Sequence, residues 1–207
     1  MSNPWLAVPL SDYEGHMNSP EVQQLSALAD LFAEALARCR PVSVAILGIA
    51  GGNGLDRIDS GVTKRIVGLD CNPTYLDAVQ ARYPFLPGLD LHCVDLAGSI
   101  DDLAPVQMVH VALVFEHAGT DRCLDNALAL VEPGGSLAVV LQLPTTVAQA
   151  VAATPFPSMQ NLKTHFTLID SAWLSRTLEA RGFHLVSVTQ RSLPAGKAFW
   201  MGFFRRK

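Results

Sequence analysis

The chain contains 207 residues, of which 49% are hydrophobic and 16% are charged, and its formal net charge is -4. This composition excludes an intrinsically disordered protein and provides enough apolar material for one substantial domain. The acidic balance argues against a nucleic-acid partner, and no run of about 18 apolar residues predicts a membrane span.

The cysteines lie far apart in the sequence and form no C-x-x-C pair, which argues against a zinc site and against a disulfide framework. The N-terminus has no basic segment followed by an apolar one, as a secretion signal would have. We therefore expect a cytoplasmic protein without a metal centre, whose thiols are reduced at Cys39, Cys71, Cys93 and Cys123.

Residues 1–40 are predicted to form an N-terminal arm and a helix, which could act together as a lid on a main domain at 41–207. The apolar residues of the arm have no clear periodicity. Trp5 and Leu6 need a surface to pack on, so we expect the arm to be ordered. Ser19 offers a helix N-cap and Pro20 a first helical position, and apolar residues follow at helical spacing as far as Arg40.

The stretch from Val42 to Asp56 joins an apolar, β-branched run to a glycine-rich turn. This pattern predicts a buried parallel strand that turns tightly into a helix or a short helical segment. Glycines in such a turn adopt positive φ and let the backbone approach a ligand closely. The alternative is an ordinary strand-to-helix turn without a ligand. The glycines are Gly48, Gly51, Gly52 and Gly54.

The rest of the chain alternates predicted strands with helices, which implies an α/β fold with a doubly wound, mostly parallel seven-stranded sheet. After the first strand, strands are predicted at 65–70, 89–94, 106–115, 136–143, 184–189 and 198–204. Helices are predicted at 74–82 and 121–131, and a third helix, capped by Asp170 or Ser171 and closed by Gly182, is predicted to run to Ala180. The short connection between the last two strands implies an antiparallel hairpin.

Acidic residues stand at the ends of three of the predicted strands. Asp70 follows Gly48 by about 20 residues, the spacing at which a carboxylate on the second strand accepts hydrogen bonds from ribose hydroxyls. Asp95 ends the third strand and Glu116 the fourth. Ligands of open parallel sheets bind at the carboxyl ends of the strands, so we expect these groups to converge on one crevice. Taken singly, each acid could merely cap the next turn.

The pattern resembles the class I S-adenosylmethionine-dependent methyltransferases, over roughly 41–204. The resemblance rests on the Leu-Gly-Ile-Ala-Gly-Gly-Asn-Gly turn, Gly-Leu-Asp-Cys-Asn-Pro at the second strand, Val-Asp-Leu at 94–96, Pro-Gly-Gly-Ser-Leu before the fifth strand, and the terminal hairpin. A looser likeness is to small bacterial methyltransferase-like proteins without a settled substrate. The resemblance implies S-adenosylmethionine as cofactor and methyl transfer to a small-molecule acceptor.

The same resemblance assigns cofactor-binding roles. The turn would border the methionine part, the end of the second strand would hold the ribose, the segment after the third strand would face the adenine, and the end of the fourth would form the floor near the sulfonium. The residues implied are Gly48, Ile49, Ala50, Gly52, Asn53, Asp70, Cys71, Asn72, Asp95, Leu96, Phe115 and Glu116. Two positions depart from the pattern: Ile46 stands where an acid is common, and Ala50 replaces a usual glycine.

A sulfonium methyl is already activated, so catalysis consists mainly of in-line approach with water excluded, and a base is needed only if the acceptor must lose a proton. His117, next to Glu116, is the candidate base, although a strand-end histidine can be purely structural. Tyr13 and His16 of the arm could close over the cofactor, or the arm could only pack on the sheet edge.

The segment 144–170 belongs to the variable last third of the chain and is predicted to help form a compact acceptor pocket. His165 and Trp173 also belong to this last third. His92 and His110 lie within predicted strands, where we expect core positions.

Two other functions share part of this pattern. A nicotinamide-dependent oxidoreductase would use the same glycine turn and Asp70, but none of Tyr13, Tyr75 and Tyr83 has a lysine four residues later, as a short-chain dehydrogenase would. A protein that binds S-adenosylmethionine or its demethylated product without catalysis also fits, given Ile46. The sequence leaves the acceptor and the oligomeric state open.

Overall fold

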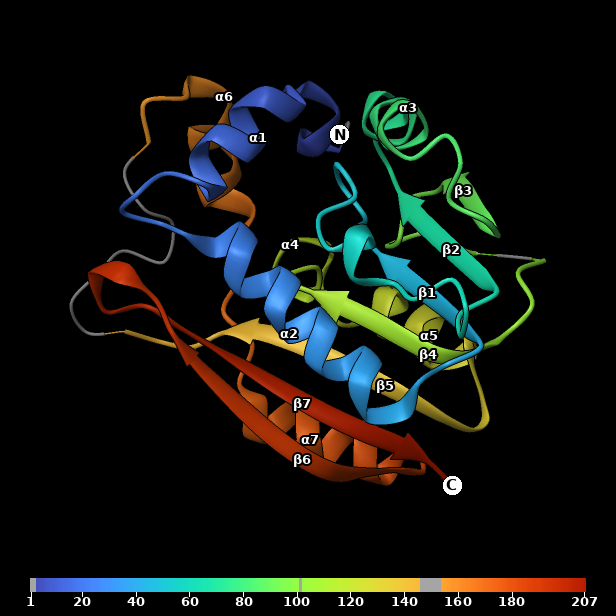
Figure 1. Ribbon diagram of the computed structural model, residues 1–207. Helices are drawn as coiled ribbons and strands as arrows, with labels where there is room; N and C mark the ends of the chain where they lie inside the picture. The colour runs from blue at the N-terminus through green and yellow to red at the C-terminus, as the bar shows by residue number, and fades with distance from the viewer. Residues whose placement is uncertain (1–2, 101, 146–153) are drawn as a thin grey trace.

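One mixed β-sheet runs through the computed structural model, which describes residues 3–100, 102–145 and 154–207 (Figure 1). Within these ranges the sheet has seven strands in the order β3-β2-β1-β4-β5-β7-β6. All neighbouring strands pair in parallel except β7, which is antiparallel to both β5 and β6. The predicted fold class is thus confirmed. The strands are β1 (Ser43–Leu47), β2 (Arg65–Asp70), β3 (Leu89–Cys93), β4 (Val106–Ala112), β5 (Val131–Gln142), β6 (Phe183–Ser192) and β7 (Ala198–Arg206).

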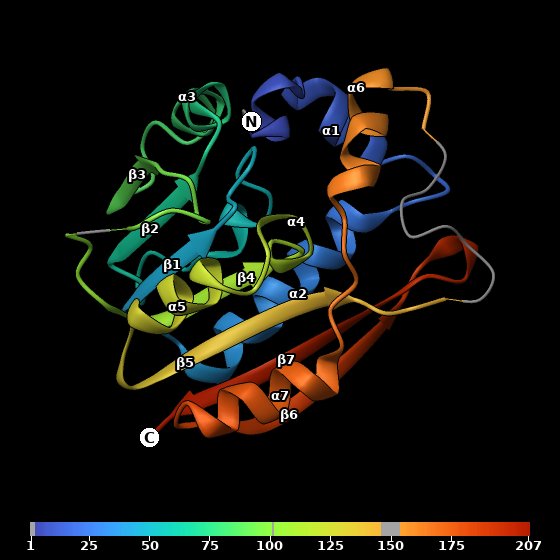
Figure 2. The same cartoon turned by 180° about the vertical axis from the view of Figure 1, so that it is seen from behind.

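Helices cover both faces of the sheet. Apolar residues of α2 and α3 pack on one face, and those of α5 and α7 pack on the other, which Figure 2 shows from behind. The α-helices are α1 (Leu10–Met17), α2 (Gln24–Cys39), α3 (Pro73–Arg82), α4 (Phe115–Ala118), α5 (Arg122–Ala129), α6 (Pro157–Gln160) and α7 (Ser171–Ala180). The 3-10 segments are η1 (Pro4–Ala7), η2 (Leu55–Arg57), η3 (Asn161–His165) and η4 (Pro194–Gly196).

The carboxyl ends of the parallel strands are covered by a roof made from the N-terminal segments η1 and α1 and the later segments α6 and η3. In both views η1 and α1 lie beside α6 and η3 on that side of the sheet (Figures 1 and 2). A small core joins them, in which Val8 packs with Met159 and Leu162. The chain order reverses between β1 and β4, where open α/β sheets form their ligand crevice. The roof therefore lies over the region in which a ligand is expected.

The start of the N-terminal helix was predicted wrongly. The helix begins at Gln24 and not at Pro20, because Gln23 has a left-handed φ of 48° that a right-handed helix cannot include. The preceding residues form a turn in which the amides of Val22 and Gln23 donate to the Ser19 carbonyl. The arm itself is ordered, as predicted, but it consists of η1 and α1.

The fourth and fifth strands also differ from their predicted ranges. β4 ends at Ala112, before the predicted end at 115, because Leu113 has a left-handed φ of 57°. The chain then forms the single turn of α4, so Phe115 and Glu116 are helical. β5 begins at Val131, earlier than predicted, and its pairing with β4 shifts register between Val106 and Met108.

Of the two predicted caps of the last helix, Asp170 is the one observed: it caps α7 by accepting from the amides of Ala172 and Trp173. Asn72, for which no cap was predicted, caps α3 by accepting a hydrogen bond from the Thr74 amide. Among the described residues, no helix has the length and apolarity to span a membrane.

Candidate functional site

A pocket of about 410 Å³ lies at the carboxyl ends of the strands. This volume is within the range of small-molecule sites, roughly 300 to 1,000 Å³. Residues at or just after strands β1 to β5 line it, in chain order Gly48, Asp70, Asp95, Leu113 and Gln142. Two of the three strand-end acids, Asp70 and Asp95, therefore converge on one crevice as predicted, whereas Glu116 does not line it. Of the residues predicted to form a site, the structure brings together around it Tyr13, His16, Gly48, Ala50, Asp70, Cys71, Asp95, Leu96 and His117.

The glycine turn and Asp70 form one hydrogen-bonded unit. The amides of Gly48 and Ile49 donate to the Leu69 carbonyl, over 2.8 and 3.0 Å. One carboxylate oxygen of Asp70 accepts from the Ala50 amide and the other from the Asn72 amide, each over 2.9 Å. These two amides fix the orientation of the carboxylate, and Asp70 also lines the pocket.

The electrostatics of Asp70 follow from its position. Burial raises the pKa of its carboxyl group, and hydrogen bonds from the backbone of Asn72, Ala50 and Cys71 oppose the rise. Its side chain is held in one orientation by backbone groups that cannot move away. A hydroxyl-bearing ligand would find a pre-oriented acceptor at this end of β2.

The turn conformation explains why small residues occupy it. Gly48 has φ +68°, and a Cβ there would lie 2.7 Å from a methyl group of Val114. Ala50 also has a positive φ, of 46°, so the residue that replaces a usual glycine keeps a glycine-like backbone. Ile46, at the other unusual position, is buried in the core on the α2 face and does not line the pocket.

Four predicted cofactor residues lie behind the pocket surface. Ile49 is in the core, and Gly52 accepts a hydrogen bond from the Tyr83 hydroxyl. Asn53 is exposed and donates to the Leu25 carbonyl, while Asn72 donates to the Trp5 carbonyl. These residues support the turn and its contacts instead of lining the cavity.

Phe115 and Glu116 do not form the pocket floor that the resemblance implied. The left-handed Leu113 turns the chain so that both side chains point into the interior, where each is 1% exposed. One carboxylate oxygen of Glu116 accepts from the Gln142 amide over 2.9 Å, and Oε2 has no hydrogen-bond partner among the described residues. Burial raises the Glu116 pKa to about 7. Leu113, Val114 and His117 line this side instead.

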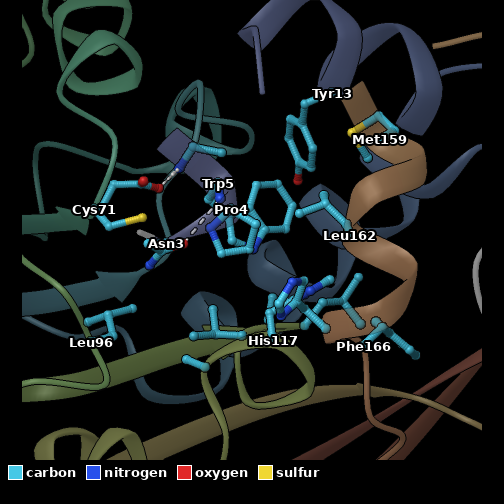
Figure 3. Close-up of a pocket in the computed structure, with 18 of the residues that line it drawn as sticks. Asn3, Pro4, Trp5, Tyr13, Cys71, Leu96, His117, Met159, Leu162 and Phe166 are labelled. Atoms are coloured by element: carbon cyan, nitrogen blue, oxygen red, sulfur yellow. Dashed lines mark hydrogen bonds between the residues drawn. The ribbon is translucent and has the colours of Figure 1, made fainter. Parts of the chain in front are cut away.

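His117 is held between aromatic rings (Figure 3). Its ring centre lies 4.9 Å from that of Trp5 and 5.1 Å from that of Phe166, both in edge-on contacts. Burial lowers the His117 pKa to about 4, and the charge of nearby His165 adds to this shift. Among the described residues, Nδ1 has no hydrogen-bond partner. At neutral pH His117 is therefore an uncharged ring in the pocket lining, and its buried Nδ1 is not used by the described side chains.

The N-terminal arm is attached to the body on the Asp70 side. Besides the bond between Trp5 and Asn72, the Tyr75 hydroxyl donates to the Val8 carbonyl over 2.9 Å. Glu14 and Arg82 form an ion pair, and Arg82 also donates to the Gly51 carbonyl over 3.0 Å. The arm thus connects directly to the glycine turn and to α3.

The opposite side of the pocket is formed in part by the predicted acceptor segment 144–170, which contributes Met159, Leu162, His165 and Phe166. Figure 3 shows Cys71 and Leu96 on one side and Leu162 and Phe166 on the other. His165 also lines it, as expected of the last third, whereas Trp173 is exposed on α7. Residues 146–153 of the predicted acceptor segment lie outside the described residues. The lining residues that neither a motif nor the predicted acceptor segment indicated include Trp5, Met17, Gln24, Gln142 and Lys197.

Among these, only Trp5 had a usable signal, namely an aromatic residue in an irregular segment that needed a surface to cover. Of the strand histidines, His110 is buried as expected, whereas His92 is half-buried beside Asp90. Within the described residues, no group of three or more His, Cys, Asp or Glu side chains is arranged to hold a metal ion.

Comparison with known proteins identifies the fold. No protein-family model matches the sequence, and no curated protein matches it. Among solved structures, magnesium protoporphyrin IX methyltransferase ChlM from Synechocystis PCC 6803, with bound S-adenosylmethionine, is similar at a TM-score of 0.72 and 10% identity, over 100% of this chain and 98% of that one. N-methyltransferase NodS from Bradyrhizobium japonicum WM9, with S-adenosylhomocysteine, is similar at a TM-score of 0.69 and 14% identity, over 99% of each chain.

A third similar structure is named for a different reaction. The cyclase SpnF matches at a TM-score of 0.67 and 16% identity, over 90% of this chain and 82% of that one. The chain therefore has the Rossmann-like methyltransferase fold. The reaction has to be argued from the site, because one fold hosts several functions.

Proposed function

We propose that the protein binds S-adenosylmethionine in this pocket and transfers its methyl group to a small-molecule acceptor. The observation that carries the proposal is Asp70, a buried carboxylate at the end of β2 that is oriented by the glycine turn and lines the pocket. The likeness of the whole fold to ChlM and NodS, whose structures contain S-adenosylmethionine or S-adenosylhomocysteine, supports the choice of cofactor.

The pocket residues fit the cofactor part by part. Asp70 would accept hydrogen bonds from the ribose hydroxyls, and Gly48 and Ala50 present bare backbone to the amino-acid part. Asp95 and Leu96 would flank the adenine with one polar and one apolar side chain. When bound, S-adenosylmethionine supplies a methyl group activated by a positively charged sulfur.

The protein itself would orient the acceptor, exclude water from the reacting atoms and provide a proton acceptor. Trp5 and the arm cover the pocket from above, which excludes water from the reacting atoms. His117, neutral at physiological pH, would accept a hydrogen bond from the N–H or O–H of the acceptor and direct its lone pair at the methyl group. If the acceptor must lose a proton, His117 is the group placed to receive it.

Titration calorimetry with S-adenosylmethionine, S-adenosylhomocysteine and NAD tests the cofactor. We expect the first two to bind and NAD not to bind, and binding of NAD alone would overturn the proposal. The likeness to SpnF makes a second measurement necessary, namely release of S-adenosylhomocysteine when acceptors are added. Binding without turnover against a broad acceptor set would instead support a non-catalytic binding protein.

A further inference from the structure

Four aromatic side chains form a continuous line along the pocket, which we call the ring wall. The ring centre of Trp5 lies 5.8 Å from that of Tyr13 and 4.9 Å from that of His117. The ring centre of His117 lies 5.1 Å from that of Phe166. These distances lie within the range over which aromatic rings attract one another, about 4.5 to 7 Å. All three contacts are edge-on, and all four side chains line the pocket.

The ring wall is assembled from three separate parts of the chain. Trp5 and Tyr13 belong to the N-terminal arm, His117 belongs to α4, and Phe166 follows η3. In Figure 3, Trp5 lies in the middle of the pocket, with Cys71 on one side and Phe166 on the other. Cys71 directly follows β2, so Phe166 lies on the side away from the proposed ribose site.

These rings are not part of the packed interior. Each of the four is half-buried, whereas the core rings of Phe183 and Phe204 are 2% and 0% exposed. Because the four rings line the pocket, part of their uncovered surface faces the cavity. Covering this apolar surface with a ligand removes it from water, which favours binding.

The ring wall carries no charge at neutral pH. Burial lowers the pKa of His117 to about 4. Burial also raises the pKa of the Tyr13 hydroxyl, and the negative charge of Asp70 raises it further. The rings of Trp5 and Phe166 do not ionise. The wall can therefore recognise a ligand by its shape and its ring contacts, and not by its charge.

The carboxylates and the lysine of the described pocket lining already interact within the protein. Asp70 accepts hydrogen bonds from two backbone amides, and Asp95 accepts from the Ala97 amide over 3.0 Å. Lys197 also has a partner within the protein. None of these three side chains is thus an isolated charge that requires an opposite charge on the acceptor.

We propose that the methyl acceptor is a flat aromatic molecule without a net charge, whose ring packs against Trp5 and Phe166 and whose N–H or O–H is directed at His117. The inference rests on the proposed function and extends it to the class of acceptor. Aromatic pairs attract beyond the effect of the area they bury, so a flat ring gains affinity that a puckered ring of the same size does not. Met159 and Leu162 add apolar lining beside the wall.

The experiment compares a flat ring system with its saturated counterpart by titration calorimetry. β-Naphthol and decahydro-β-naphthol share one carbon skeleton, carry one hydroxyl group each and are uncharged at neutral pH. Both are titrated into wild type, Phe166→Leu and Trp5→Leu, with and without saturating S-adenosylhomocysteine. Leucine keeps an apolar side chain but removes the ring. Phe85→Leu and Trp173→Leu are the matched controls, because both residues are exposed and neither lines the pocket.

With S-adenosylhomocysteine bound, we expect wild type and both controls to bind β-naphthol about tenfold more tightly than decahydro-β-naphthol. Phe166→Leu and Trp5→Leu should each reduce this preference to about threefold or less. Equal affinity for the two alcohols in wild type, no binding of either, or a preference that survives in both variants would overturn the inference. Circular dichroism of each variant identifies loss of folding, and the wild-type comparison stands without any variant.

Two further titrations of wild type test the site and the charge. If S-adenosylhomocysteine displaces β-naphthol, the ring wall belongs to the cofactor side and the inference is overturned. Tighter binding of β-naphthoate or of β-naphthylmethylammonium than of β-naphthol would overturn it as well, because charge and not the flat ring would then dominate recognition.

Failure of the cofactor proposal would look different. If S-adenosylhomocysteine does not bind but the preference for the flat alcohol depends on Phe166, the aromatic site is real and the methyl-transfer function is wrong. If S-adenosylhomocysteine binds and the preference is absent, the function stands and the acceptor class is wrong.

Discussion

The side of the pocket around Asp70 and the side around Lys197 are built from very different spans of the chain. The first takes Gly48, Ala50 and Asp70 from two adjacent strands and their turns, and backbone hydrogen bonds hold it. The second takes His16, Gln142 and Lys197 from segments far apart in the sequence. The local unit gives the pocket its proposed cofactor side, whereas the dispersed unit depends on tertiary contacts between segments far apart in the sequence.

Removing the carboxylate of Asp70 should have the largest effect. In Asp70→Ala the ribose hydroxyls lose their acceptor, so we expect the affinity for S-adenosylhomocysteine to fall by about 100-fold or more. The amides of Ala50 and Asn72 lose their acceptor too, so the free energy of unfolding should fall by roughly 2 kcal/mol. Calorimetry and urea unfolding measure these changes, with the exposed Asp77→Ala as control. Unchanged affinity would count heavily against a cofactor role for this side.

The pH dependence of the free energy of unfolding tests whether Glu116 is buried beneath the pocket, as the structure places it. Its pKa is raised from 4.5 to about 7, so the folded protein binds more protons than the unfolded one between these values, and this carboxyl destabilises the fold increasingly as pH rises through that window. Glu116→Gln removes the titration. The stability of the variant relative to wild type should increase by about 3 kcal/mol between about pH 4.5 and pH 7, then stay constant.

Urea unfolding of both proteins across this range measures the difference. His110 and His117 have pKa values lowered to about 4, so each contributes stability that is lost as pH falls through its window. These histidines change both proteins equally, and the comparison cancels them. If the difference in the free energy of unfolding between variant and wild type does not change with pH, folding does not raise the pKa of Glu116.

A substitution of His117 tests the residue at which the Asp70 side and the Lys197 side of the pocket meet. His117→Phe keeps an aromatic ring between Trp5 and Phe166 but removes the proton acceptor, so we expect kcat to fall by about 100-fold while S-adenosylhomocysteine affinity is unchanged. Because the imidazole is neutral above about pH 4, the wild-type rate should not fall between pH 8 and pH 5 through protonation of His117. His184→Phe, at an exposed position of β6, is the control. An unchanged kcat in His117→Phe would assign this histidine a structural role.

The ion pair between Glu14 and Arg82 should have the smallest effect. It joins the arm to α3 at an exposed position, where such pairs contribute about 0.2 to 1 kcal/mol. If the arm acts as a lid, Arg82→Met should speed dissociation of S-adenosylhomocysteine by up to about fivefold. Stopped-flow fluorescence of Trp5 can follow this step, with Arg57→Met, whose ion pairs are with Asp30 and Asp56, as control. Equal dissociation rates of S-adenosylhomocysteine in Arg82→Met and Arg57→Met would show that loss of the Glu14–Arg82 ion pair does not release the arm.

The sequence alone determined the sheet, its antiparallel end and the residues of the glycine turn with Asp70. Such features depend on residues close together in the chain, because strand periodicity, turn glycines and capping side chains act locally. Asp170, one of the two predicted caps of the last helix, caps α7 for the same reason.

Tertiary structure alone decided the start of α2, the inward turn of Glu116 and the side of the pocket around Lys197. Gln23 and Leu113 adopt left-handed backbones that no propensity indicates, and each redirects the side chains that follow. Gln24, Gln142 and Lys197 have no pattern in common along the chain. Their proximity is created by the pairing of β5 with β7 and by the packing of α2 on the sheet, contacts between residues far apart in sequence.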